Sequence, residues 1–308
     1  MRVLITGGLG FIGQNLALHL RRNNPSWEIS AIDWFDGASE AEEEIFNVVH
    51  KHCFASDEIM SKYNDVDVII HLAAYTTVQE SISDPLRSLD NNVIKTIKLL
   101  EYVRHNSPHT KIIFASTGGA IIGEYDGKIN EQIAARPLSP YGASKLAVEG
   151  LLSAYNGSFG VSSASMRFSN VYGPNSFRKS SVIAAFCKSY LKEGKIQING
   201  DGQQTRDYIY VDDISEAILQ VILQDEQGVF QLGTGIGTSI LELARIFQDI
   251  DADKNIELDY AQALSGEVRH NKADISHIQK TLGFEPKIKI EQGIYNTLNW
   301  FKKMDDCI

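Results

Sequence analysis

The sequence predicts an α/β fold in which a doubly wound parallel sheet carries helices on both faces. Five short apolar runs read as buried strands, at 2–6, 29–33, 66–72, 111–117 and 162–168. Helical stretches separate these runs, which is the alternation typical of a parallel sheet. A glycine-rich turn follows the first run, and the second run ends in a carboxylate. Those two features predict a ligand site at one edge of the sheet.

The first strand runs into Thr6-Gly7-Gly8-Leu9-Gly10-Phe11-Ile12-Gly13, after which apolar residues continue at helical spacing. In this context Gly7 permits a tight turn and Gly10 lets the backbone approach a pyrophosphate. Gly13 allows close packing of helix on strand, and the helix N-terminus faces the phosphates. Alone, such glycines indicate only a turn before a helix. Here they predict a Rossmann dinucleotide site.

Asp33 ends the second strand, 20 residues after Gly13. A carboxylate at this distance can accept hydrogen bonds from a ribose 2′-hydroxyl, but it would repel a 2′-phosphate. The sequence therefore favours NAD over NADP as the cofactor.

Tyr141 and Lys145 form the second informative pair. Ser139 and Pro140 are typical of a helix start, so Tyr141 falls in the first turn and Lys145 lies on the same face. A free tyrosine has a pKa of about 10. A nearby cation, the positive helix end and an oxidised nicotinamide would favour its phenolate. Alone, this spacing usually means a surface helix, but beside a dinucleotide site it predicts an acid/base pair.

Further motifs follow in order along the chain: His71-Leu72-Ala73-Ala74, Val78-Gln79-Glu80-Ser81-Ile82-Ser83-Asp84-Pro85, Asn92-Val93, Phe114-Ala115-Ser116-Thr117-Gly118-Gly119, Arg167-Phe168-Ser169-Asn170-Val171-Tyr172-Gly173-Pro174, Gln204-Thr205-Arg206-Asp207-Tyr208-Ile209-Tyr210-Val211-Asp212-Asp213 and Gly266-Glu267-Val268-Arg269. Together the motifs resemble the extended short-chain dehydrogenase/reductase family. Within it, the chain is most similar to NAD-dependent nucleotide-sugar epimerases and dehydratases of the UDP-glucose 4-epimerase type. The resemblance extends over essentially the whole chain.

This resemblance implies a Rossmann domain over 1–172 that binds NAD and a smaller mixed domain over 173–308 that binds a nucleotide-sugar, with 206–234 returning to the first. It also implies a homodimer formed by two helices of each subunit, here 92–105 and 141–155. Ile94, Ile97, Leu100 and Leu146 offer apolar positions in those stretches, although all could equally belong to the core of one subunit.

The family pattern also implies roles for individual residues. The expected catalytic residues are Tyr141, Lys145 and Thr117, with Ser116 as the fallback for Thr117. The expected cofactor contacts are Gly7, Gly10, Phe11, Ile12, Gly13, Asp33, Asp57, Leu72, Ala73, Ala74, Asn92, Ser116, Tyr141 and Lys145. The expected substrate contacts are Val78, Thr117, Asn170, Arg206, Glu267, Arg269 and Asn271. Arginine's rigid fork suits the diphosphate expected beside Arg206.

The chain departs from the family pattern in three places. Ile122 replaces a tyrosine before Gly123, and Leu264 replaces an arginine that meets the diphosphate, a contact that Arg269 or Lys179 could restore. Thr117 lies six residues before Gly123, one more than usual. We expect an additional loop residue near Gly118 to restore the register.

The neighbours of Thr117 favour one reaction. Related 4,6-dehydratases place an Asp-Glu pair directly after this hydroxyl residue, because eliminating water requires a further acid and base. Here the positions hold Gly118 and Gly119. We therefore expect a 4-epimerase that works through a transient 4-keto sugar. A dehydratase, decarboxylase or 4-ketoreductase stays open as an alternative, and so does a non-enzymatic dinucleotide sensor, although a sensor would be expected to lose Tyr141 or Lys145.

Asn271 bears on the choice of sugar. In the family this position stands beside the C2 substituent, where tyrosine restricts the site to plain hexoses. Asparagine is smaller and can offer an amide to an acetamido oxygen. We expect N-acetylated sugars to be tolerated, unless Asn271 is a polar loop residue that points to solvent.

Composition sets the remaining limits. The 308 residues are 43% hydrophobic and 22% charged, which is ordinary for a globular enzyme, and the net charge of −10 disfavours nucleic acid as a partner. No apolar run is long enough for a membrane span. Three scattered cysteines and two close histidines suggest neither disulfides nor a metal site, so we expect a cytoplasmic protein. Residues 39–44 carry four glutamates and read as a solvated acidic face.

Overall fold

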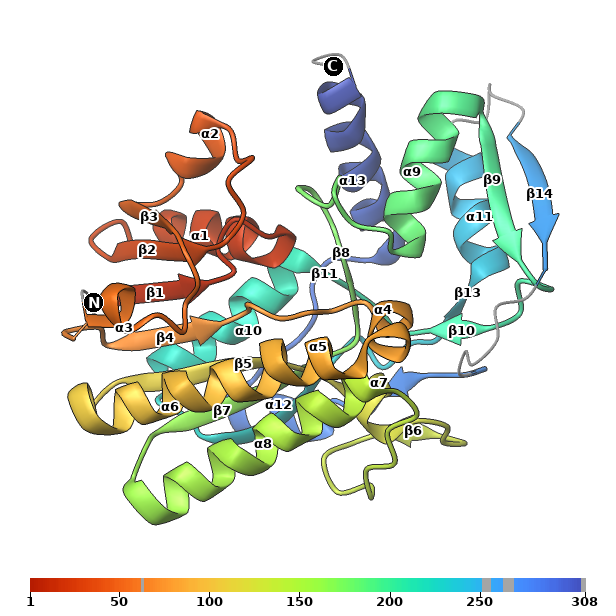
Figure 1. Cartoon of the computed structure of the whole chain (residues 1–308). Coiled ribbons are helices and arrows are strands. Elements are labelled where there is room, and N and C mark those ends of the chain that lie inside the picture. The colour runs from red at the N-terminus through yellow and green to blue at the C-terminus, as the bar shows by residue number, and fades with distance from the viewer. Residues whose placement is uncertain (62–63, 251–255, 263–268, 306–308) are drawn as a thin grey trace.

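The computed structural model describes residues 1–61, 64–250, 256–262 and 269–305 (Figure 1). Its centre is a parallel sheet of seven strands in the order β12-β7-β5-β4-β1-β2-β3. The bounds are β1 Arg2–Thr6, β2 Glu28–Asp33, β3 Val48–Lys51, β4 Val68–His71, β5 Lys111–Thr117, β7 Ser163–Phe168 and β12 Gly228–Leu232. All five predicted strands are confirmed, and β3 and β12 form the two edges.

Helices cover both faces of the sheet, as predicted (Figure 1). In β1, Val3 and Ile5 point to one face, where they pack with α1 (Phe11–Asn23), α10 (Val211–Leu223) and α12 (Ser276–Leu282). Leu4 points to the other face and packs with α3 (Asp57–Met60), α6 (Lys95–Asn106) and α8 (Pro140–Phe159). Alternating side chains along a strand thus divide the core into two layers.

A smaller part lies beside the sheet, on the right of Figure 1, and has its own apolar cluster. Its helices are α9 Val182–Glu193, α11 Ile240–Ile250 and α13 Ile290–Asp305. Its strands are β9 Lys195–Asn199, which pairs with β14 Glu257–Ala261, and β10 Thr205–Arg206, which pairs with β13 Thr238–Ser239. Two further pairs join the parts: β8 Asn170–Tyr172 with β11 Tyr208–Tyr210, and β6 Lys128–Ile129 with β15 Lys272–Ala273.

Asp207 fastens these connections to one another. Its fully buried carboxylate accepts hydrogen bonds from the backbone N–H groups of Thr234 at 2.8 Å, Gly235 at 2.9 Å and Ala273 at 3.1 Å. These bonds join the segment after Arg206 to the end of β12 and to β15. The carboxylate therefore sets where the neighbouring segments lie at the edge of the sheet.

Short helical segments occupy the connections near that edge. They are α2 Glu40–Glu43, α4 Val78–Ser83, α5 Pro85–Leu89, a π-helical turn at Asp90–Ile94 and α7 Gly118–Ile122. Because α7 directly follows Thr117, the expected additional loop residue is instead part of a helical turn. In the described ranges, no helix has both the length and the apolar character needed to cross a membrane.

Candidate active site

A cavity of about 430 Å³ lies at the carboxyl ends of the central strands, where ligands bind in open parallel sheets. Twelve of the predicted cofactor contacts line it: Gly7, Gly10, Phe11, Ile12, Gly13, Asp33, Leu72, Ala73, Ala74, Ser116, Tyr141 and Lys145. The structure thus brings the glycine turn and the Tyr141 pair to one space.

The glycine turn leaves the start of α1 bare. Gly7 has φ +71°, and a β-carbon there would lie 2.8 Å from the backbone nitrogen of Ala73. A β-carbon on Gly13 would lie 2.7 Å from the Gly7 carbonyl oxygen. Helix α1 begins without a side-chain cap and without an acidic residue in its first turn. Its free N–H groups and positive end fit the diphosphate of a dinucleotide.

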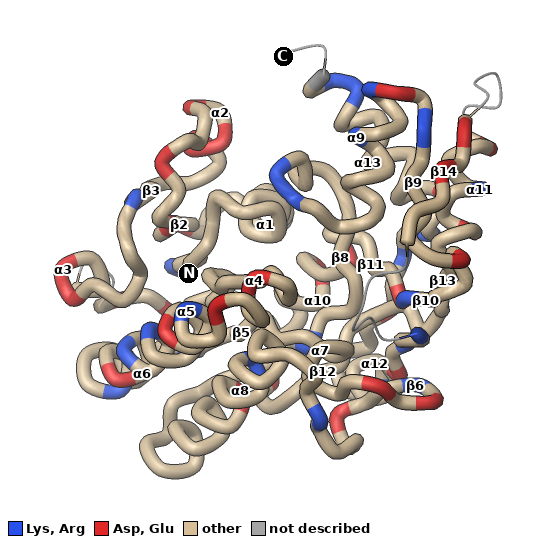
Figure 2. Tube along the Cα trace, turned by 45° about the vertical axis from the view of Figure 1, so that its right-hand side comes forward, with Lys and Arg blue, Asp and Glu red and all other residues tan. Residues whose placement is uncertain are grey.

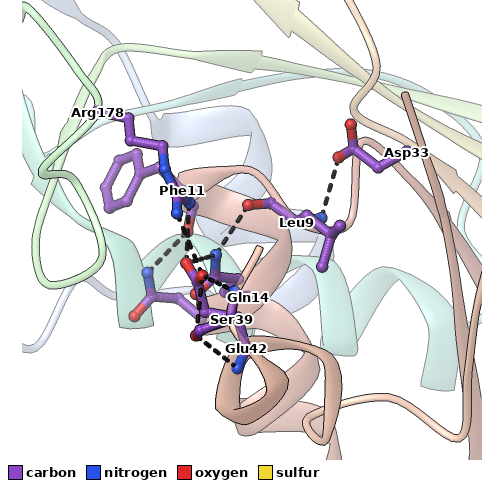
Figure 3. Close-up of polar contacts among 8 residues, drawn as sticks. Leu9, Phe11, Gln14, Asp33, Ser39, Glu42 and Arg178 are labelled. Atoms are coloured by element: carbon purple, nitrogen blue, oxygen red, sulfur yellow. Dashed lines mark hydrogen bonds and ion pairs between the residues drawn. The ribbon is translucent and has the colours of Figure 1, made fainter. Parts of the chain in front are cut away.

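Asp33 is held in the cavity wall by the backbone. Its carboxylate is 8% exposed and accepts a hydrogen bond from the N–H of Leu9 at 3.0 Å (Figure 3). It accepts another from the N–H of Phe35 at 3.1 Å. Burial raises the pKa of this carboxyl group, while those hydrogen bonds oppose the rise. Each oxygen keeps a lone pair, so the residue can still accept the two hydroxyl groups of a ribose.

The start of α8 places Tyr141 and Lys145 as predicted. Ser139 caps the helix by accepting a hydrogen bond from the N–H of Gly142 at 3.1 Å. The Lys145 ammonium donates to the Ala115 carbonyl at 2.8 Å, and it lies 6.0 Å from the centroid of the Tyr141 ring. Burial lowers the pKa of Lys145 to about 7 and raises that of Tyr141 to about 12. The protein alone therefore does not favour the phenolate, contrary to the expectation from Lys145.

Ser116 and Thr117 have different surroundings. The Ser116 hydroxyl donates to the buried carboxylate of Glu149 at 2.6 Å, and Glu149 also forms an ion pair with Arg167 at 2.7 Å. Thr117 ends β5 and is half-buried, and its hydroxyl makes no hydrogen bond within the described part of the chain. The hydroxyl of Thr117 is therefore the one that is available to a ligand.

Two expected cofactor contacts, Asn92 and Asp57, lie outside the cavity wall, and so do the expected substrate contacts Val78 and Thr117. Asn92 is buried in the π-helical turn, where its amide bonds with both backbone groups of Tyr75 and donates to Ser144 at 2.9 Å. It fixes the wall and does not line it. Val78 begins α4 and is exposed, and Asp57 begins α3 and is also exposed.

A second cavity of about 380 Å³ is lined by Asn170 and Arg206, two of the predicted substrate contacts. The Arg206 guanidinium donates to the carbonyl of Thr205 at 2.9 Å. Arg269 forms an exposed ion pair with Asp201 at 2.7 Å. Glu267, together with Leu264, lies outside the described residues.

Two side chains fill the space beside the glycines that follow Thr117. A β-carbon on Gly118 would lie 2.6 Å from the amide nitrogen of Gln231, and one on Gly119 would overlap the amide of Asn271. Asn271 thus lies against α7 and does not point to solvent. Sequence reasoning missed Gln231, which no local motif marks.

The acidic segment at 39–44 differs from the sequence interpretation. Figure 2 shows α2 as an acidic segment, but Glu42 is not simply solvated, because its carboxylate forms an ion pair with Arg178 at 2.8 Å. Arg178 and the neighbouring Lys179 both line the cofactor cavity. No local pattern in the sequence indicates this ion pair, because its partners are far apart in the chain.

The family model described as the NAD dependent epimerase/dehydratase family matches residues 3–233. The chain belongs to this family.

Its solved relatives include several activities. UDP-N-acetylglucosamine 4-epimerase from Methanobrevibacter ruminantium is 30% identical, covers 98% of both chains and superposes with a TM-score of 0.90. UDP-glucose 4-epimerase from Thermus thermophilus, in complex with NAD, is 30% identical, covers 98% of this chain and 99% of its own, and has a TM-score of 0.89. An NAD-dependent NDP-hexosamine 5,6-dehydratase of tunicamycin biosynthesis is 28% identical over 98% of both chains, also with a TM-score of 0.89. The protein is thus an NAD-dependent enzyme of this family, while its relatives differ in reaction.

We expect Asp33→Ser to weaken NAD binding about tenfold or more and to narrow the preference for NAD over NADP, because the carboxylate both accepts the ribose hydroxyl and repels a 2′-phosphate. Binding of each nucleotide can be measured by calorimetry on protein freed of bound cofactor. Asp36→Ser, three residues along, is the matched control. An unchanged preference in the Asp33 variant would contradict the role given to this carboxylate.

Proposed function

We propose that the protein is a nucleotide-sugar 4-epimerase that acts on a UDP-hexose or UDP-N-acetylhexosamine. One observation favours a 4-epimerase over a dehydratase. The acid/base pair Tyr141 and Lys145 lies in the cofactor cavity, whereas the two positions after Thr117 hold glycines that other side chains cover. The site can therefore oxidise a hydroxyl group but has no second acid and base at that place.

The packing around the glycines supports this argument. An Asp-Glu pair at positions 118 and 119 would need room for two β-carbons, and the amides of Gln231 and Asn271 occupy that room. Gln231 is fully buried and held by a hydrogen bond to the Arg167 carbonyl at 3.0 Å, so it cannot easily move aside. Elimination of water would need catalytic groups from elsewhere in the structure.

The side chains can share the work as follows. Tyr141 takes the proton of the sugar's 4-hydroxyl, and Thr117, with its free hydroxyl, holds the same oxygen by a hydrogen bond. Lys145, one helical turn from Tyr141, anchors the ribose beside the reacting atoms. When bound, oxidised NAD accepts and later returns the hydride, and its positive nicotinamide favours the Tyr141 phenolate. For epimerisation, the pocket would have to let the keto sugar turn over so that its other face meets the cofactor.

The second cavity fits the nucleotide end of the substrate. In this proposal Arg206 swings from the Thr205 carbonyl to the diphosphate, and Asn170 contacts the substrate beside it. Glu267 would hold the nucleotide ribose, Arg269 would add charge nearby, and Val78 would touch the sugar. The division into 1–172 for NAD and 173–308 for the nucleotide-sugar, with 206–234 returning, follows from these roles.

Another reaction of the family is the second candidate, because the 5,6-dehydratase is as similar in fold as the epimerases. Incubating the protein with UDP-glucose, UDP-galactose and their N-acetylated forms, with products followed by NMR, separates the candidates. Interconversion at C4 supports the proposal. A dehydrated, decarboxylated or reduced product would replace it, and no conversion of any sugar would point to a dinucleotide sensor.

We expect Tyr141→Phe to lower turnover by about 10² or more, because a positioned acid/base contributes that much to rate. NAD content and thermal stability should stay unchanged. Tyr125→Phe, at an exposed tyrosine, is the control and should be fully active. Normal turnover of the Tyr141 variant would exclude the mechanism.

Asn271→Tyr should reduce turnover of UDP-N-acetylhexosamines much more than turnover of UDP-glucose or UDP-galactose. The larger ring would have to leave its place against Gly119 and enter the space beside the sugar. Steady-state kinetics on the four sugars measure the ratio. A wild-type enzyme that is inert toward every N-acetylated sugar but active on plain hexoses would refute the assignment.

We also propose a homodimer that pairs α6 and α8 with their copies. The exposed face of α8 has no charged side chain, since the only two charged residues of this helix, Lys145 and Glu149, are buried. Gly150 and Gly157 are not required by the subunit, because nothing lies within 4 Å of an added β-carbon at either position. Such a face suits close contact with a second helix. Leu100, in contrast, is fully buried within the subunit.

Light scattering at micromolar protein should report twice the mass of one chain. Gly150→Arg, which adds a charge to the middle of that face, should give monomers without loss of NAD. A monomeric wild-type protein would reject the proposed dimer.

A further inference from the structure

The loop at 173–181 crosses the start of α1 and joins β8 to α9. We call residues 173–181 the strap. Its first half is fixed to α1, because the Asn15 amide donates to the Pro174 carbonyl at 2.9 Å and the Asn175 amide donates back to Asn15 at 3.3 Å. The strap therefore lies over the helix end that faces the dinucleotide diphosphate.

The middle of the strap is fixed to α2 by Arg178. Its guanidinium donates to both carboxylate oxygens of Glu42, at 2.8 and 3.2 Å (Figure 3). The guanidinium also lies 4.5 Å from the centroid of the Phe35 ring. Glu42 itself is held in place, because it completes a capping box with Ser39 and accepts a hydrogen bond from Gln14 at 2.9 Å. A bidentate pair of this kind fixes both distance and direction.

Partial burial alone would raise the pKa of Glu42, but its hydrogen bonds, led by those from Arg178, lower it to about 2. The carboxylate is therefore charged throughout the physiological range. The carboxylate of Glu42 therefore neutralises the charge of Arg178.

Lys179 differs from Arg178 in its surroundings. It lines the cofactor cavity, and its ammonium has no ion pair, hydrogen bond or ring contact within the described ranges. Its backbone is nevertheless fixed, since the Lys188 ammonium donates to the Lys179 carbonyl at 2.8 Å. Burial lowers the pKa of Lys179, which is the effect expected of a cation that lacks a counter-charge. The side chain is thus held in the wall with its charge unmatched.

The surroundings of the Lys179 ammonium favour the binding of an anion. The positive end of α1 faces the same cavity, and no acidic residue lies in its first turn. Asp33, the acidic residue in the cavity wall, is already bonded to two backbone N–H groups. A half-buried lysine beside a positive helix end is stabilised when an anion with several oxygens binds between them.

We propose that Lys179 is a diphosphate-binding residue and that the pair of Arg178 and Glu42 positions it by holding the strap closed. Two diphosphates have this chemistry. We expect the diphosphate of NAD in the first place, because Lys179 lines the cavity that contains the glycine turn. The other is that of the nucleotide-sugar, because the next residues, Ser180 and Ser181, line the second cavity.

The test measures binding and not turnover. Lys179→Met removes the charge but keeps much of the side-chain volume. In one arm, exchange of bound NAD for isotopically labelled NAD is followed by mass spectrometry. In the other, UDP is titrated into NAD-loaded protein by calorimetry. We expect the affinity for either NAD or UDP to fall about ten- to a hundredfold, which is the range for a charge-assisted hydrogen bond. The arm that changes identifies the diphosphate that Lys179 binds.

Two further variants control for unrelated effects. Lys192→Met removes an exposed charge at the other end of α9 and should change neither arm. Lys179→Arg keeps the charge and should retain binding. The thermal stability of each variant shows whether a loss of binding reflects poor folding instead. Unchanged NAD exchange and unchanged UDP affinity in a folded Lys179→Met protein would overturn the proposal.

The strap is tested by Arg178→Met, which leaves the α2 capping box intact. Because the pair with Glu42 is partly exposed, we expect a smaller effect, about three- to tenfold, in the same arm as Lys179→Met. If Arg178 acts through Lys179, the double variant should bind no more weakly than Lys179→Met alone. Additive losses, or no loss in Arg178→Met, would overturn the positioning role. Neither binding measurement depends on epimerisation. The role of Lys179 can therefore be decided even if the protein does not catalyse the proposed reaction.

Discussion

At the carboxyl end of β1 the chain has no room for a β-carbon. The backbone of the glycine turn meets the backbone of Ala73 after β4, and the start of α1 rests on the carbonyl of Gly7. This contact of backbone on backbone brings α1, β1 and β4 together at a single point. The cavity, the position of Asp33 and the approach to Tyr141 all depend on it. A side chain in the turn would push α1 outward and remove the bare helix end.

The acid/base pair depends on a different support, built from buried polar groups beneath it. Lys145 reaches the Ala115 carbonyl, and the next residue, Ser116, bonds to Glu149, which pairs with Arg167. Buried charges of this kind are tolerated because each is paired and hydrogen-bonded. His71 lies on the same side of the sheet, and its pKa falls to about 3 through burial and the Lys145 charge, so it is a neutral structural residue.

Local signals in the sequence were enough for the strands, the glycine turn and the start of α8. Each rests on neighbouring residues: the apolar run of β1, the spacing of glycines, and Ser139 before Pro140. The pairing of Glu42 with Arg178 could not be predicted, because 136 residues separate the partners and an acidic run gives no sign of its counter-charge.

The role of Asn92 was also out of reach. Its amide faces Tyr75 only because the helix widens into a π turn, and no residue type in the sequence predicts such a turn. The cofactor contact that the family pattern implies for Asp57 stays a prediction, because this residue is exposed at the start of α3 and does not line the cavity. Nor could the pattern show that Asn271 and Gln231 fill the space beside the glycines, because that contact joins three separate segments.

The order of strands has a consequence for how the chain must fold. Strand β7 is paired with β5 on one side, but its other side waits for β12, where Gly228 comes to lie opposite Ala164. Three elements of the smaller part, α9, β9 and β10, are synthesised between them. Until then β7 is an open edge of exposed N–H and C=O groups, the kind of template on which strands of other chains assemble. The last strand of the sheet therefore pairs only after a long loop has closed, which slows folding and makes the nascent first half the stage most prone to aggregation.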